Sequence, residues 1–301
     1  MLPMKLSFNQ VSGIGYQVFC CLLLATCYLL PATCPAQAVS TETQTAEYWD
    51  KQGIIAENAK NYKEAVDNYT HALMLNDKYA DAYFGRGIAA EKLGWTDGAM
   101  LDFDDAIKLN PIDADMYYNR GLLKFKLDKH KAAIKDYTKA IQLKPDFVYA
   151  YYNRAYAYYH SDLFSKAIED YTKVIELKPD FIEAYNDRGN AESNLGYFKD
   201  ALEDFNSAIK LDPKFGLGYY NKGHVEYVLK KYKEALADFT KTIELIPKDA
   251  DAYNDRGEAN FNLGNYTDAV NDFKKAVKLV PNNQLYIENL RVATTKALSN
   301  L

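Results

Sequence analysis

The chain has 301 residues, 36 of them basic and 41 acidic, with a formal net charge of −5. A nucleic-acid-binding protein needs a basic surface for the phosphates, so this balance argues against nucleic acid as a partner. The sequence also lacks HExxH, GxSxG and a glycine-rich phosphate loop, and its four histidines (71, 130, 160 and 224) have no metal-ligand spacing. We therefore expect no enzyme activity, no catalytic residue, no metal and no cofactor.

Residues 1–38 predict a signal peptide. They contain one charged side chain, Lys5, then a thirteen-residue apolar run over Val18–Leu30, and they end in the sequence Pro-Ala-Gln-Ala. The run is too short to span a bilayer, and the small residues around the glutamine suit cleavage after Ala38. We therefore expect an exported protein, periplasmic or secreted, with residues 39–45 as a short polar linker.

The cysteines leave two alternatives to simple export. All four (20, 21, 27 and 34) lie in the leader, so a cleaved chain can form no disulfide. Acylation of Cys27 or Cys34 would make a lipoprotein, although each follows a threonine rather than the glycine, alanine or serine typical of such signals. A retained N-terminal anchor is the second alternative. After cleavage we expect no membrane-spanning segment.

Beyond residue 45 the sequence repeats every 34 residues. Every proline in this part stands at that interval, at 111, 145, 179, 213, 247 and 281. Within each unit, positions 4 and 24 are aromatic, position 20 is alanine, and position 8 is glycine except for Ala155. Such a period indicates a stacked array rather than one globular core. With proline at position 32, the repeats 1 to 7 are 46–79, 80–113, 114–147, 148–181, 182–215, 216–249 and 250–283.

Each unit predicts two antiparallel helices. Apolar residues recur at helical spacing in two blocks, which a turn such as Leu195-Gly196-Tyr197 separates. The small residues at positions 8 and 20 let the helices approach closely, and the proline ends the second helix. Over 46–283 this pattern resembles the tetratricopeptide repeat (TPR) family, with Asp77 in place of the first proline. The resemblance implies an all-α, right-handed solenoid of seven helix-turn-helix repeats that binds proteins or peptides.

Residues 284–301 predict a C-terminal capping helix, because a terminal repeat needs a cover for its apolar face. Ile287, Leu290, Ala297 and Leu301 fall on one side of that helix. A dimerisation surface is the alternative, and we expect a monomer.

Two further positions predict an ion pair inside each repeat. Position 7 is arginine or lysine and position 23 is aspartate in repeats 2 to 7, whereas repeat 1 has Gln52 and Asn68. Because both positions change from charged to neutral together, we expect their side chains to pair between the two helices, in a structural role.

The family resemblance implies that the first helices line the concave face and expose positions 2, 5, 6, 9, 12 and 13. Position 6 resembles the asparagine ladder in the TPR superhelix of O-GlcNAc transferase, which implies a grip on the backbone of an extended peptide. An asparagine can both donate and accept, and helices ~10 Å apart would place one rung at every third residue of a chain rising ~3.3 Å per residue. An ordinary polar face is the alternative. The row, from repeat 3 onward, consists of Asn119, Asn153, Asp187, Asn221 and Asp255.

Tyrosines that the repeat pattern does not require accompany this row, and we expect them to contact the ligand. Packing against the next repeat is the alternative reading. Basic residues are scarce at these positions, so we expect a neutral or basic partner. The tyrosines at positions 5, 9 and 12 are Tyr118, Tyr152, Tyr220, Tyr156, Tyr159 and Tyr227.

Taken together, these patterns predict an exported, non-enzymatic scaffold that binds a protein or an extended peptide on its concave face. Two other functions stay open. One is a structural subunit of a cell-envelope or secretion assembly, docked through the convex face or the ends. The other is a glycan-binding module that uses the tyrosines.

Overall fold

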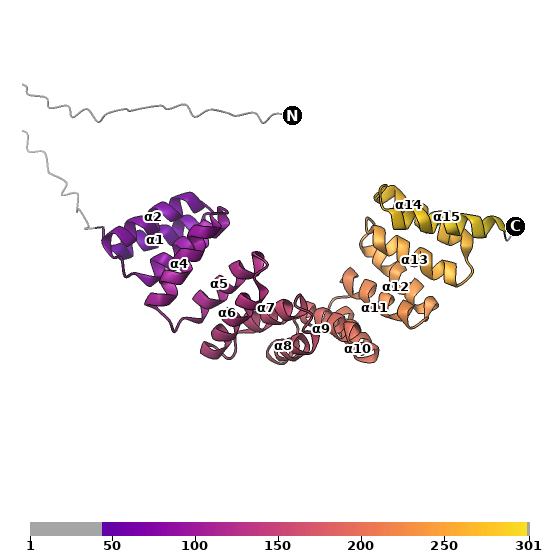
Figure 1. Ribbon diagram of the computed structural model, residues 1–301, viewed down its shortest axis with the longest axis horizontal. Coiled ribbons are helices and arrows are strands. Elements are labelled where there is room, and N and C mark those ends of the chain that lie inside the picture. Colours follow the sequence, from indigo (N-terminus) through magenta and orange to yellow (C-terminus); the bar gives the residue numbers. More distant parts are fainter. Residues whose placement is uncertain (1–43, 300–301) are drawn as a thin grey trace, which may run out of the picture. The chain divides into compact units, whose positions relative to one another are not determined.

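The computed structural model describes residues 44–299. The predicted signal peptide and Leu301 lie outside these residues, and so does most of the linker. The described part of the chain contains fifteen helices and no strand, which confirms the all-α prediction (Figure 1). None of these helices is long and apolar enough to cross a bilayer.

Fourteen helices form seven consecutive hairpins, and each second helix in repeats 2 to 7 ends two residues before the repeat's proline. The first helices are α1 (Ala46–Asn58), α3 (Ala80–Lys92), α5 (Ala114–Lys126), α7 (Val148–Tyr159), α9 (Ile182–Asn194), α11 (Gly216–Val228) and α13 (Ala250–Asn262). The second helices are α2 (Tyr62–Leu75), α4 (Thr96–Leu109), α6 (His130–Leu143), α8 (Phe164–Leu177), α10 (Phe198–Leu211), α12 (Tyr232–Leu245) and α14 (Tyr266–Leu279).

In six of the seven hairpins the glycine at position 8 lies close against the aromatic residue at position 24. A Cβ atom at Gly189 would lie 2.8 Å from the ring of Phe205, and one at Gly53 would lie 2.5 Å from the ring of Tyr69. The glycine therefore lets the ring lie flat against the first helix. Alanine at position 20 is completely buried in every repeat.

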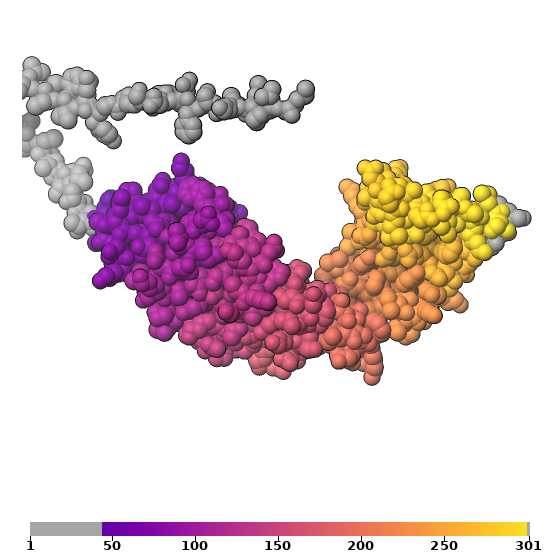
Figure 2. Space-filling view, viewed as in Figure 1, coloured from indigo at the N-terminus to yellow at the C-terminus, as the bar shows by residue number. Residues whose placement is uncertain are grey.

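The first helices lie on the inner side of the array. Each first helix contacts the next first helix, whereas successive second helices do not contact one another within residues 44–299. Each second helix instead packs against the first helix that follows it. The repeats therefore form a curved row, and its hollowed side is visible in Figure 2.

The predicted ion pairs are present. In five repeats an arginine binds its aspartate through two parallel hydrogen bonds of 2.6–3.0 Å. In repeat 6 the Nζ atom of Lys222 lies 3.0 Å from Asp238. Each arginine also donates to position 25 of the preceding repeat, as Arg188 does to Thr172 at 2.9 Å. The pair thus joins three helices, which makes it a structural element of the stack.

The last helix, α15 (Gln284–Ser299), covers the end of repeat 7 as predicted, and its buried face differs from the predicted one at Ile287. Ile287 is 39% exposed, whereas Tyr286 and Ala293 are buried, with Leu290 and Ala297 beside them. Tyr286 takes the place predicted for Ile287 because its ring packs on α14 while its hydroxyl donates to Asp251 of α13.

Candidate functional site

The five residues of the predicted ladder lie on α5, α7, α9, α11 and α13, where the first helices meet. All five side chains are half-buried rather than fully exposed. They form a row with one member in each of repeats 3 to 7, as expected from their position in the repeat.

From Asn153 onward, each member of the ladder is hydrogen-bonded to position 5 of the preceding repeat. The partner at position 5 is a tyrosine in three of these bonds and an asparagine in two, and the row continues into the capping helix. They are Asn153 Nδ2 to Tyr118 Oη (2.9 Å), Tyr152 Oη to Asp187 Oδ2 (2.6 Å), Asn221 Nδ2 to Asn186 Oδ1 (2.8 Å), Tyr220 Oη to Asp255 Oδ2 (2.8 Å) and Asn289 Nδ2 to Asn254 Oδ1 (2.9 Å). The ladder therefore also joins neighbouring repeats.

Position 5 is less exposed than expected, because it faces the next first helix. Asn186 and Asn254 are buried, and Tyr118, Tyr152 and Tyr220 are half-buried. Burial and the neighbouring Asp187 carboxylate raise the pKa of the Tyr152 hydroxyl, which keeps it a hydrogen-bond donor. These three tyrosines thus serve contacts between repeats and offer only part of their surface to a ligand.

A second row of bonds joins position 12 to position 13 of the next repeat. Tyr159 and Tyr227 accept hydrogen bonds of 3.1 Å from Asn194 and Asn262. Both tyrosines are half-buried. Tyr156, at position 9 and 37% exposed, is the most exposed of the six predicted tyrosines.

The ladder asparagines differ from the prediction in what they can offer. Asn119 and Asn153 each donate from Nδ2 to a backbone carbonyl of their own helix at 2.9 Å. The Nδ2 groups of Asn153 and Asn221 also donate to the preceding repeat. The Oδ1 atoms of these three residues receive no hydrogen bond from another described residue. The row is therefore rich in free acceptors, which suit N–H donors of a ligand.

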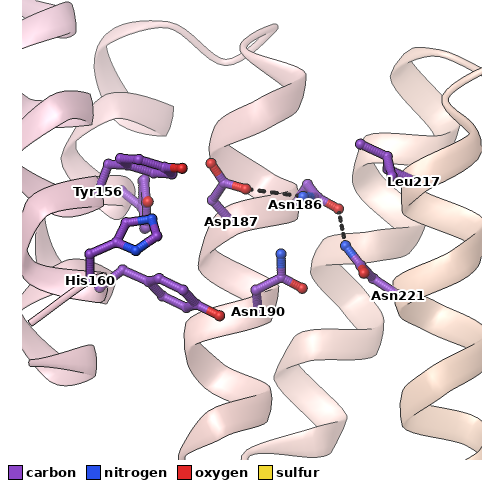
Figure 3. Close-up of a pocket in the computed structure, with 9 residues that line it drawn as sticks. Tyr156, His160, Asn186, Asp187, Asn190, Leu217 and Asn221 are labelled. Atoms are coloured by element: carbon purple, nitrogen blue, oxygen red, sulfur yellow. Dashed lines mark hydrogen bonds between the residues drawn. The ribbon is translucent and has the colours of Figure 1, made fainter. Parts of the chain in front are cut away.

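A hollow of about 340 Å³ lies among α7, α9 and α11 (Figure 3). It brings together four predicted residues with five that the sequence analysis did not single out. Burial raises the pKa of the Asp187 carboxyl group, which faces this space. The predicted residues are Tyr156, Tyr159, Asp187 and Asn221, and the others are His160, Tyr171, Asn186, Asn190 and Leu217.

Tetratricopeptide repeat profiles match residues 51–115, 114–147, 148–181, 182–215, 217–249 and 250–283. The chain belongs to the tetratricopeptide repeat family. Proteins of this family bind peptides or other proteins and are generally non-catalytic, so the chain is a protein-interaction scaffold.

Three solved structures illustrate the likeness. A TPR protein fragment from Cytophaga hutchinsonii is 19% identical, covers 80% of this chain and 98% of its own, and has a TM-score of 0.66. MamA is 26% identical over 57% of this chain and 94% of its own, with a TM-score of 0.54. YrrB, described as a TPR protein with an unusual peptide-binding site, is 24% identical over 62% and 96%, with a TM-score of 0.52. No curated protein matches the chain.

Proposed function

We propose that this TPR protein is exported and binds an extended segment of a partner protein along its first helices. The observation that carries the proposal is the row of free acceptor oxygens on Asn119, Asn153 and Asn221. These oxygens stand at position 6 of repeats 3, 4 and 6, and each first helix contacts the next one. Neighbouring helices packed ~10 Å apart would meet every third N–H of an extended chain that rises ~3.3 Å per residue.

The proposed ligand is neutral or basic. The row itself contains two aspartates and no cation, and Asp187 and Asp255 accept hydrogen bonds only from neutral groups within residues 44–299. An acidic segment laid along this row would meet like charge in a partly buried setting. A neutral or basic segment would donate its N–H groups without that repulsion.

Binding can be tested with peptides selected from a random twelve-residue library on residues 39–301. The dissociation constant of each selected peptide is then measured for the wild type and for the triple variant Asn119→Ala/Asn153→Ala/Asn221→Ala. The matched control removes three exposed amides from second helices, in Gln142→Ala/Asn206→Ala/Asn271→Ala. Circular dichroism checks that all three proteins keep their helices, because Asn153 and Asn221 also join repeats.

We expect the ladder variant to bind at least about tenfold more weakly, since each lost hydrogen bond contributes roughly 0.5–1.5 kcal/mol. The control variant should bind like the wild type. Equal affinity for all three proteins would place the ligand elsewhere and would contradict the proposal.

A structural subunit that docks through its outer surface is the second candidate. Repeats 1 and 2 favour it locally, because Met74, Leu101 and Ile112 are 78%, 66% and 77% exposed. This candidate predicts that the assembly binds the ladder variant and the wild type equally. The same assembly should fail to bind a Met74→Ser/Leu101→Ser/Ile112→Ser variant.

Export can be tested directly by identifying the N-terminal residue of the protein purified from its native host. Cleavage after Ala38 predicts Val39 as the first residue by mass spectrometry. A chain that still begins at Met1 would contradict export by this signal, and an acylated cysteine would show a lipoprotein.

A further inference from the structure

The hollow among α7, α9 and α11 places aromatic rings around a carboxylate. Figure 3 shows Tyr156 and His160 on one side, Asp187 and Asn190 on the middle helix, and Asn221 on the third. The rings of Tyr156 and His160 are 4.4 Å apart, edge to face. The other side chains that line the hollow include no lysine and no arginine.

The Asp187 carboxylate has no lysine or arginine partner among the described residues. Its two hydrogen bonds come from neutral groups, the hydroxyl of Tyr152 at 2.6 Å and the amide of Asn186 at 3.0 Å. A partly buried carboxylate is unfavourable unless a positive charge compensates for its lost hydration, and burial accordingly raises the pKa of this group. A cation in the hollow would supply that compensation.

The wall of the hollow also contains an unpaired hydroxyl. Tyr171 is fully buried, and its Oη atom has no hydrogen-bond partner within residues 44–299. At the same position of repeat 1, the hydroxyl of Tyr69 donates to Glu57 at 3.1 Å. A buried hydroxyl without a partner costs free energy, so a ligand that bonds to Tyr171 would gain from it.

We infer that this hollow holds the side chain of a lysine or an arginine in the bound segment. Its N–H donors would bond to Asp187, to the free Oδ1 of Asn221 and to the hydroxyl oxygen of Tyr171. The ring of Tyr156 would contact the cation, and the apolar stem would lie on Leu217. The volume of about 340 Å³ is large enough for one long side chain. The inference rests on the proposed peptide-binding function and specifies its ligand.

Repeat 7 provides an internal control. Asp255 accepts a hydrogen bond from Tyr220 at 2.8 Å, just as Asp187 does from Tyr152. The preceding repeat, however, has His224, Val228 and Phe239 where the hollow has Tyr156, His160 and Tyr171. Replacement of either aspartate removes the same charge from the same row, but only Asp187 faces the hollow.

The test uses labelled twelve-residue alanine–serine peptides with one central residue: lysine, its neutral analogue norleucine, arginine or its neutral analogue citrulline. Fluorescence anisotropy measures their affinities for the wild type, Asp187→Asn, Tyr156→Ala and the control Asp255→Asn. An asparagine at 187 can still accept from Tyr152, so that variant should keep its fold, which circular dichroism checks. We expect the basic peptides to bind the wild type and Asp255→Asn about tenfold more tightly than the neutral ones. In Asp187→Asn and Tyr156→Ala this preference should fall below about threefold.

The other outcomes separate this inference from the proposed function. Equal binding of all four peptides, with affinity lost in the ladder variant, would overturn the inference and leave the proposed function standing. Failure of every peptide to bind would speak against both. Equal loss of preference in Asp187→Asn and Asp255→Asn would show general charge attraction and no specific pocket. If cellotetraose displaces the peptides, and if its binding requires Tyr156, the hollow is a glycan-binding site instead.

Discussion

Repeats 1 and 2 form the same hairpin as repeats 3 to 7 but differ on the first-helix face. Position 6 is Lys51 in repeat 1 and Gly85 in repeat 2, whereas it is asparagine or aspartate in the other five. The first helices α1 and α3 nevertheless have the same length, thirteen residues, as α5 and α9. The hairpin and its stacking therefore do not require the ladder, which supports a role for the ladder beyond the fold.

The ladder stops at repeat 2 for a steric reason. The ring of Tyr69 occupies the space beside Gly85, where a Cβ atom would lie 2.4 Å from Cζ. The boundary between repeats 1 and 2 is thus packed by an aromatic ring, whereas polar bonds from position 5 to position 6 join the later repeats. The two regions use different side chains to hold the same stack.

The largest expected effect concerns the ion pair that repeat 1 lacks. Arg154→Gln leaves the buried Asp170 without its two hydrogen bonds of 2.7 Å. We expect the free energy of unfolding to fall by about 3–5 kcal/mol, because an uncompensated charge is left in a buried position. Urea denaturation measures this loss without a change in ionic strength.

The matching double variant, Arg154→Gln/Asp170→Asn, recreates the neutral pair of Gln52 and Asn68. At least half of the lost stability should return, since no unpaired charge remains. If the two losses simply add in the double variant, the two residues stabilise the repeat independently. The neutral pair in repeat 1 would then be no substitute for the ion pair of the other repeats.

A smaller effect is expected where the ladder ends. Gly85→Ala places a Cβ atom against the ring of Tyr69 and should lower the free energy of unfolding by about 1–3 kcal/mol. Gly98→Ala is the control, because Gly98 lies in the helix α4 with no other atom within 4 Å of the added Cβ. This control should gain about 0.5–1 kcal/mol by the higher helix propensity of alanine. Thermal denaturation that shows equal shifts for both variants would contradict the steric explanation.

The sequence predicted the elements that depend on position within one repeat. The seven hairpins, the aromatic contact with the small residue at position 8, and the pairs such as Arg188 with Asp204 all follow from a period of 34. Each of these involves residues on two helices of the same hairpin. Their distances are set by local helix geometry, which the pattern of small and apolar residues determines.

The contacts between repeats could not be predicted in the same way. Tyr152 and Asp187 are 35 residues apart, one more than the period, because position 5 of one first helix faces position 6 of the next. This offset of one residue arises from the packing of whole hairpins, and it cannot be predicted from a pattern within one repeat. Tyr286 and the unpaired hydroxyl of Tyr171 were missed for the same reason, since both depend on how neighbouring repeats meet.

A pH-dependent effect distinguishes repeat 5 from repeats 1 and 2. Glu192, at position 11, is buried beside Asp204, and its burial together with that charge raises the pKa of Glu192 to about 7. Repeats 1 and 2 have alanine at position 11. Between the ordinary glutamate pKa and about 7, the unfolded chain releases a proton that the folded chain retains, so the free energy of unfolding falls as pH rises.

Glu192→Gln should therefore leave stability unchanged at pH 4.5 and raise it by roughly 1–2 kcal/mol at pH 8, after allowance for solvent screening. Urea denaturation across this range gives the profile. The control is Glu169→Gln, which removes an exposed glutamate of α8 and should show no comparable rise. A gain that is equal at both pH values would show that packing, and not the charge of Glu192, sets the effect.

The smallest effect tests a feature that the two regions share. The turn inside every repeat has a left-handed residue at position 15, which is glycine in repeats 2, 5 and 7 but Lys60 in repeat 1 and Lys230 in repeat 6, with φ of 61° and 60°. A side chain in this conformation costs about 1 kcal/mol relative to glycine. Lys60→Gly and Lys230→Gly should thus each raise the free energy of unfolding by roughly 0.5–1 kcal/mol, while Gly196→Ala should lower it by a similar amount. Equal gains at Lys60 and Lys230 in thermal denaturation would show that the turn has the same energetics in both regions, so that the regions differ in the first-helix face alone. A gain at only one lysine would mean that the hairpins themselves differ.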